Sequence, residues 1–90
     1  MNQRAVDILV DASMRGVRQI KYSQSDGMGG FCAMGVLVDA MRDVPLTTTD
    51  FDTFYGMTRD ERMAVVHANN ELGWDFLTIA RNMGGDARTS

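Results

Sequence analysis

Cysteine and proline are almost absent from these 90 residues, which hold one of each, Cys32 and Pro45. A single cysteine cannot form a disulfide within the chain, so the sequence excludes a small secreted scaffold held together by disulfides. The scarcity of proline, with 44% apolar and 23% charged residues, argues against a disordered chain. We therefore expect one compact domain over residues 1–84 and a flexible C-terminal tail at 85–90.

Long apolar runs are also missing from the chain. The longest mainly apolar stretch, residues 33–41, is far shorter than the roughly 20 residues that a membrane-spanning helix needs. The sequence does not open with the basic and then apolar pattern of a secretory signal peptide. These absences predict a cytoplasmic protein that makes no contact with a membrane.

Basic residues are also fewer than acidic ones. The formal net charge is -3, and the nine Lys and Arg residues are scattered without a basic run. Affinity for nucleic acid depends on basic side chains that neutralise phosphates. The charge balance therefore makes nucleic acid a less favoured partner than protein.

The chain lacks a recognisable catalytic or metal-binding constellation. The single histidine, His67, has only Glu71 at ligand spacing on its predicted helix, whereas zinc takes about four ligands. Cys32 stands among apolar residues, which predicts a buried and inert thiol. The glycine-rich segment 26–30 lacks the endings of phosphate-binding loops. We expect no enzyme activity, no catalytic residue, no cofactor and no metal, because an enzyme would need a pocket that joins Cys32 or His67 to distant carboxylates.

The apolar spacing predicts a helix over residues 2–15. Asn2 is a plausible N-cap and Gly16 a plausible C-terminal stop. Between them, apolar residues recur at the spacing of one helical face: Ala5, Ile8, Leu9 and Ala12.

After residue 16 the spacing of apolar residues changes from the helical period to alternation, one residue in two. In residues 17–24, Ile20 and Tyr22 alternate with polar residues, which predicts a half-buried strand with both on one face. The glycines of 25–30 favour a turn, and residues 31–33 can return as a second strand. Together these segments predict a short β-hairpin.

Residues 33–43 again show helical spacing, and Val44 and Pro45 should end this second helix. Gly35 is costly inside a helix, by about 1 kcal/mol relative to alanine, so we expect it to admit another element at close range. Residues 46–57 are irregular. Thr49 or Asp50 could cap one short helical turn there.

Two further helices complete the predicted fold. Thr58 and Glu61 form a capping box at the start of a third helix. Its inner face should hold Met63, Val66 and Asn70, with Val65 and Ala68 at the border of that face. Gly73 should end it, and a fourth helix should then run from an N-cap at residue 75 to residue 83. The predicted fold class is α+β, with an N-terminal helix, a short β-hairpin and then three helices.

Two separated segments carry a resemblance. Asp26-Gly27, followed by Phe-Cys-Ala-Met-Gly-Val-Leu-Val-Asp at 31–39, resembles a "DG…(F/Y)CCLGVLCD" motif. Residues 70–80 resemble "ND-x-G-x-SF-x-x-IA". Both motifs belong to a family of small uncharacterised phage and prophage proteins. Ala33 and Val38 stand where that family often has cysteines, and Asp75 stands where it usually has serine. The resemblance implies a phage origin, a host cytoplasmic location and a compact α+β fold, and it carries over no functional residue.

These observations lead to a functional hypothesis. We expect a non-enzymatic phage accessory protein that binds and modulates a host or phage protein and that could also form a homodimer. Eight methionines are many for this length, and methionine-rich surfaces adapt to partners. The expected interaction surface combines Met28, Phe54, Tyr55, Met57 and Trp74.

The alternative hypothesis is a small DNA-binding regulator. Residues 58–83 could form a helix-turn-helix unit around Gly73, with the second helix in the major groove. Its candidate DNA-binding residues are Thr78, Arg81 and Asn82, because arginine and asparagine read base edges well.

Overall fold

The computed structural model describes residues 1–45 and 50–84. Over these residues the chain forms α1 (Gln3–Met14), β1 (Arg18–Gln19), β2 (Gly30–Phe31), α2 (Ala33–Asp39), α3 (Phe51–Tyr55), α4 (Arg59–Asn70) and α5 (Phe76–Met83). The predicted α+β class is confirmed. The predicted tail at 85–90 and the candidate cap Thr49 lie outside the described residues.

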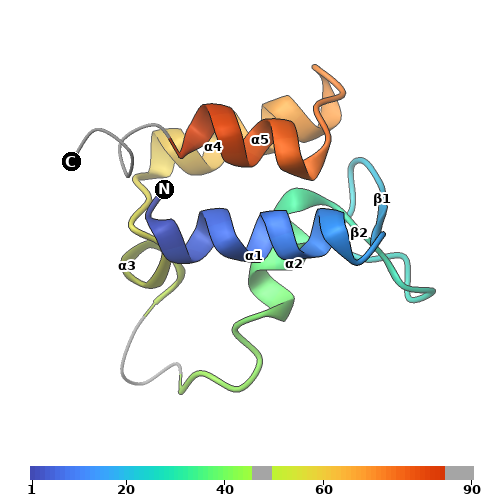
Figure 1. Ribbon diagram of the computed structural model, residues 1–90. Coiled ribbons are helices and arrows are strands. Elements are labelled where there is room, and N and C mark those ends of the chain that lie inside the picture. The colour runs from blue at the N-terminus through green and yellow to red at the C-terminus, as the bar shows by residue number, and fades with distance from the viewer. Residues whose placement is uncertain (46–49, 85–90) are drawn as a thin grey trace.

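Helix α1 runs through the middle of the molecule, with α4 and α5 on one side and α2 and α3 on the other (Figure 1). Asn2 caps it as predicted, because the Ala5 amide donates to the Asn2 side chain at 3.0 Å. Gly16 follows the helix with φ +71°, a conformation that glycine adopts without strain. The largest fully buried side chains come from every layer: Tyr55, Leu9, Leu37, Ile79, Val65 and Asn69.

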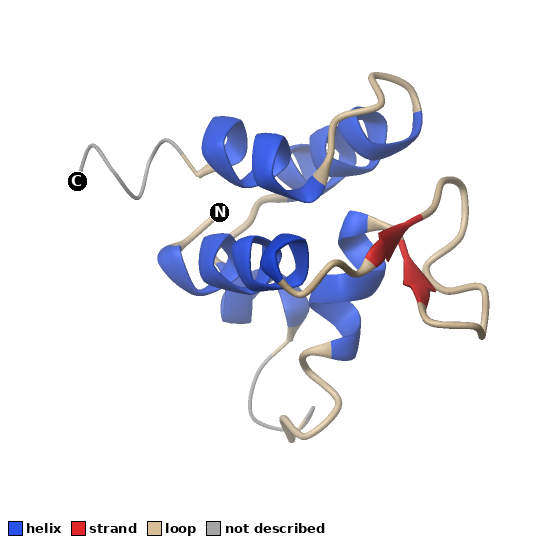
Figure 2. Ribbon diagram, turned by 45° about the vertical axis from the view of Figure 1, so that its right-hand side comes forward, coloured by secondary structure: helices blue, strands red, loops and turns tan. Residues whose placement is uncertain are grey.

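The two strands pair in parallel, so the predicted β-hairpin is wrong (Figure 2). Arg18 lies opposite Gly30, and Gln19 lies opposite Phe31. The glycine turn does reverse the chain, but the antiparallel partner of Phe31 is Ser25 in a single bridge. The alternation in 17–24 ends early, because β1 stops at Gln19 and Tyr22 takes a left-handed backbone conformation. When the chain returns as β2, it runs in the same direction as β1.

Helix α2 ends at Asp39, four residues before the predicted end at residue 43. The amides of Met41, Arg42 and Val44 each donate to the carbonyl three residues earlier, so the chain tightens into turns ahead of Pro45. Asp50 caps α3, as one of the two predicted alternatives.

The inner face of α4 is rotated from the predicted one. Val65 and Ala68, predicted at the border of that face, are buried together with Asn69, whereas Met63 is 53% exposed. The capping box of Thr58 and Glu61 is present as predicted. The shift follows from the packing of α4 against both α2 and α5, which places the residues between these two neighbours inside.

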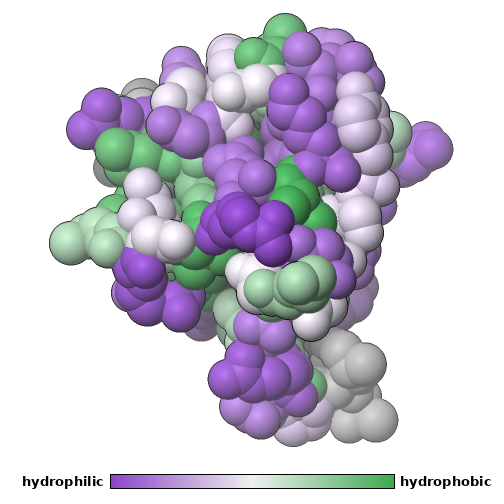
Figure 3. Space-filling view, turned by 90° about the vertical axis from the view of Figure 1, so that its right-hand side faces the viewer, coloured by the Kyte–Doolittle hydropathy of each residue, from purple (hydrophilic) through white to green (hydrophobic). Residues whose placement is uncertain are grey.

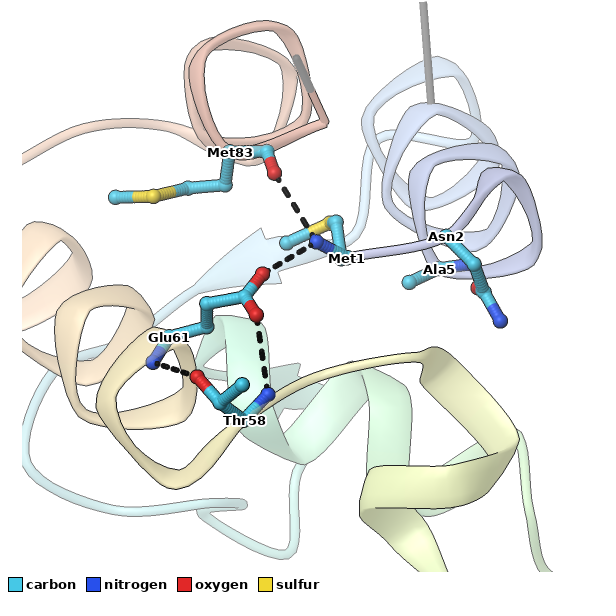
Figure 4. A network of polar contacts seen from close by, with 6 residues as sticks. All are labelled: Met1, Asn2, Ala5, Thr58, Glu61 and Met83. Atoms are coloured by element: carbon cyan, nitrogen blue, oxygen red, sulfur yellow. Dashed lines mark hydrogen bonds and ion pairs between the residues drawn. The ribbon is translucent and has the colours of Figure 1, made fainter. Parts of the chain in front are cut away.

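The N-terminus is fastened to α4 and α5 (Figure 4). The Met1 ammonium donates to a Glu61 carboxylate oxygen at 2.8 Å and to the Met83 carbonyl at 3.2 Å. The other carboxylate oxygen of Glu61 accepts the Thr58 amide at 3.1 Å. One carboxylate thus joins the first residue of the chain to the start of α4.

Candidate protein-interaction surface

The C-terminal end of α4 is a polar anchor for the rest of the molecule. Asn69 is only 2% exposed. Its side-chain amide donates to the Ile20 carbonyl at 2.9 Å, and its carbonyl accepts the Ala33 amide at 3.0 Å and the Gln19 side chain at 2.7 Å. Because a buried amide without partners is costly, this one side chain fixes β1 and the start of α2 against α4.

Gln19 extends the anchor to the turn between α4 and α5. Its side-chain amide also donates to the Trp74 carbonyl at 2.7 Å. The Trp74 amide in turn donates to the Ala68 carbonyl at 3.0 Å. The strand, the end of α4 and the beginning of α5 are therefore held in one hydrogen-bonded junction.

Residues 20–29, here called the Tyr22 loop, leave β1 from this junction. Tyr22 has φ +63°, in the left-handed region, and is the only residue other than glycine found there in 1–45 and 50–84. Its backbone amide donates to the Asn70 side chain at 2.9 Å, and its hydroxyl donates to Glu71 at 3.1 Å. The hydrogen bond to the Glu71 carboxylate raises the pKa of the Tyr22 hydroxyl. Tyr22 as a whole is nevertheless 70% exposed.

Asp26 organises the far end of the Tyr22 loop. One carboxylate oxygen accepts the amides of Met28 at 2.8 Å and Gly30 at 2.9 Å, and the other is paired with Arg18. The two backbone amides, followed by Arg18, lower the pKa of Asp26 to about 2. Met28 projects from this turn with 83% of its surface exposed.

The inner side of the Tyr22 loop rests on α2. A Cβ atom at Gly35 would lie 1.9 Å from the Gln24 carbonyl oxygen. The same carbonyl accepts the Cys32 amide at 3.3 Å. The prediction that Gly35 admits another element is confirmed, and the loop is held on its inner side as well as at both ends.

Two residues of the predicted interaction surface lie in the core. Tyr55 is fully buried, and its hydroxyl donates to the Leu37 carbonyl at 2.6 Å. Met57 is 5% exposed. Both side chains are buried because α3 turns its aromatic face inward, where Phe51 and Phe54 make edge-on ring contacts with Tyr55.

The other three residues of that surface do not form one patch. Phe54 is half-buried beneath the Arg4 guanidinium, which lies 4.3 Å from the ring centre. It belongs to α3, at the opposite end of the molecule from the strands (Figure 1). Met28 and the half-buried Trp74 belong to the end that carries the strands and the α4–α5 turn. Only these two remain candidates for a common surface.

The residues proposed for DNA binding lie on α5. Arg81 and Asn82 are exposed and Thr78 is half-buried. The Asn82 side chain donates to the Thr78 carbonyl at 2.8 Å within its own helix. Asp75 caps the N-terminus of α5, and its pKa is lowered by the Thr78 amide, so a negative charge sits at the end of the helix that would enter the groove. This arrangement opposes contact with phosphates.

The two residues considered for catalysis lie in different surroundings. Cys32 is buried, and its sulfur accepts the Gly35 amide at 3.3 Å as the N-cap of α2. His67 lies exposed on α4. Across residues 1–45 and 50–84, no group of three or more histidine, cysteine or acidic side chains is placed to hold a metal ion.

Comparisons with protein-family models, curated protein sequences and solved structures return no match for this chain. The resemblance to small phage proteins therefore stays a prediction based on its two motifs. None of the helices in the described residues has the length and apolar character required to cross a membrane.

The sequence pattern indicates the exposed Met28, but it does not predict the polar residues at the end of α4 that hold the Tyr22 loop. Met28 stood out as a methionine within a glycine-rich turn. The roles of Asn69, Asn70 and Glu71 were not predicted, although three polar residues before a helix-ending glycine are a usable signal for side chains that bind neighbouring backbone. The alternation of residues 17–24 predicts that Tyr22 shares a strand face with Ile20, since nothing in the local sequence predicts a left-handed conformation.

Proposed function

We propose that this protein is an accessory protein that acts by binding another protein, of the host or of a phage, through the Tyr22 loop. The observation that carries the proposal is the state of Tyr22, an exposed ring on a left-handed backbone whose amide and hydroxyl are both held by the end of α4. Such a backbone conformation costs about 1–3 kcal/mol and is concentrated at functional sites.

A fixed and exposed aromatic side chain is well suited to recognition. Tyrosine offers a large contact area at a small loss of conformational entropy, and that loss is smaller still when the ring is already held. Met28 complements it, because a flexible thioether fits surfaces of different shape. One rigid and one adaptable group thus project from a loop whose backbone is hydrogen-bonded at both ends.

The test is affinity capture with a C-terminally tagged chain from a lysate of its source cell, with and without nuclease, read by mass spectrometry. Tyr22→Asn removes the ring and keeps a residue that tolerates a left-handed backbone. Met28→Ala removes the second group. Met14→Ala is the matched control, because Met14 on α1 is 82% exposed and Met28 is 83% exposed.

The expected result is a nuclease-resistant partner protein that the control retains and Tyr22→Asn loses by about tenfold or more in affinity. Retention of the partner by both loop variants would place binding elsewhere. A captured set that disappears with nuclease would favour the DNA-binding alternative.

A further inference from the structure

A cleft of about 270 Å³ opens between the C-terminal halves of α1 and α2, beside the two strands. Its apolar lining comes from Ile8, Val17, Phe31, Val36 and Ala40. An apolar cavity of about 150 Å³ is enough to accept benzene, so this cleft has room for one large apolar side chain. Figure 3 faces this end of the molecule and shows green side chains in gaps between purple ones.

The rim of the cleft is charged with an acidic excess. It holds three carboxylates against two guanidinium groups. Arg15 pairs with Asp11 at 2.7 Å, and Arg42 pairs with Asp39 at 2.9 Å. Asp43 is 4.0 Å from the already paired Arg42, and its side chain is 93% exposed. After pairing, the rim therefore retains a negative charge centred on Asp43.

The backbone adds to this negative field. Both α1 and α2 end at the cleft, where Arg15, the C-cap residue of α1, and Arg42, three residues beyond the end of α2, stand on the rim. The C-terminus of a helix carries about half a negative elementary charge from its aligned peptide dipoles. The two helix ends and the three carboxylates together outweigh the two arginines, so the cleft favours positive charge around its apolar residues.

We infer that this cleft binds a basic segment of the partner protein, with one large apolar side chain in the cleft and arginine or lysine residues on either side of it. The inference rests on the protein-binding function proposed above and adds the chemistry of the bound segment. The apolar side chain supplies the burial, and the flanking cations meet the Asp43 side of the rim and the ends of the two helices.

The test uses defined peptides and ¹⁵N–¹H NMR of the full chain at low ionic strength. The probe is a capped pentapeptide with phenylalanine between two arginines on each side. One control peptide has glycine in place of phenylalanine, and another has aspartate in place of every arginine. Asp43→Arg reverses the exposed rim charge, and Asp60→Arg, on exposed α4 surface, is the matched control for net charge.

We expect the basic phenylalanine peptide to shift the amide signals of Val17, Phe31 and Val36. Both control peptides should bind more weakly, and Asp43→Arg should weaken the phenylalanine peptide about fivefold relative to Asp60→Arg. Equal binding of the three peptides, equal effects of the two variants, or the absence of shifts at the cleft would overturn the inference. A partner captured in a Tyr22-dependent manner would then leave the proposed function standing.

Discussion

Gly35 and Tyr22 both determine the position of the Tyr22 loop. Gly35 does so because it has no side chain, and Tyr22 does so through its hydrogen bonds to Asn70 and Glu71. The absence of a Cβ at Gly35 lets the Gln24 carbonyl approach α2, and this approach sets the path of the Tyr22 loop. Tyr22 then takes a backbone conformation that glycine would adopt at less cost. The loop is therefore positioned by packing on one side and by the asparagine and glutamate at the end of α4 on the other.

Replacement of Gly35 by alanine should destabilise the protein. Alanine gains about 1 kcal/mol in helix propensity, but its Cβ would lie 1.9 Å from a backbone oxygen that cannot rotate away. Overpacking of this kind costs about 1–3 kcal/mol, so we expect a net loss of about 1–2 kcal/mol in unfolding free energy. Urea denaturation measures it, with the exposed Val38→Ala in the same helix as a control that changes stability by less than about 0.5 kcal/mol. A stabilised Gly35→Ala protein would contradict the close approach.

Asp26 should make the Tyr22 loop sensitive to acid. Its pKa is lowered from 3.8 to about 2 in the folded protein, so its contribution to stability is complete above the unfolded value and is lost as the pH falls towards 2. NMR titration of the Asp26 carboxyl carbon should give a midpoint near 2. Asp26→Asn should speed amide exchange at Met28 and Gly30 at neutral pH while leaving the amides of α5 unchanged. A midpoint near the ordinary value would show that the two amide hydrogen bonds are not kept in solution.

At the scale of elements, caps and stops could be predicted and long-range pairing could not. Three such features act within one helical turn, so the residue types at those positions are enough to predict them: the Asn2 cap, the Thr58–Glu61 capping box and the turn at Gly73. The parallel pairing of β1 with β2 depends on Asn69, which is 50 positions away from Gln19 in the sequence. No local pattern encodes such a contact. For the same reason the sequence pattern indicates Met28 but does not predict that Asn70 and Glu71 at the end of α4 hold the Tyr22 loop.

Removal of the Asn69 side chain should loosen the elements that meet there. Asn69→Ala leaves the Ala33 amide and the Ile20 carbonyl without their partner inside the protein. Unsatisfied buried polar groups cost about 1–3 kcal/mol each, so we expect a loss of about 3 kcal/mol in unfolding free energy. Thermal denaturation checks this, and Asn82→Ala, which loses only a bond within its own helix, should change stability little. Equal effects of the two substitutions would refute the anchoring role of Asn69.

At the scale of the whole molecule, the two ends differ in kind. The end that carries the N-terminus, α3 and the start of α4 is closed by the Met1 ammonium and the Glu61 carboxylate (Figure 1). The opposite end carries the Tyr22 loop and the α4–α5 turn. The charged cleft lies between the C-terminal halves of α1 and α2. The proposed binding surfaces thus lie away from the contacts that fasten the start of the chain.

Glu61 should give the whole fold part of its acid sensitivity. The hydrogen bond from the Met1 ammonium, followed by that from the Thr58 amide, lowers the pKa of Glu61 below 4.5. Its stabilising effect is therefore present above that pH and declines as the pH falls through the folded pKa. Glu61→Gln keeps a capping-box side chain and removes the charge, so it should cost about 1 kcal/mol at pH 7, after allowance for solvent screening at a side chain that is 35% exposed.

Chemical denaturation at pH 7 and pH 3 separates this charge effect from a packing effect. The gap in stability between the native chain and Glu61→Gln should narrow at pH 3. A gap of the same size at both pH values would assign the loss to packing.

Trp74 gives this junction an optical reporter. It is the single tryptophan of the chain, it is half-buried, and its carbonyl accepts the Gln19 side chain at the point where β1, α4 and α5 meet. The fluorescence of one indole therefore originates beside the anchor of the Tyr22 loop and nowhere else in the protein. A shift of its emission on addition of a partner would follow occupation of the surface without any attached dye.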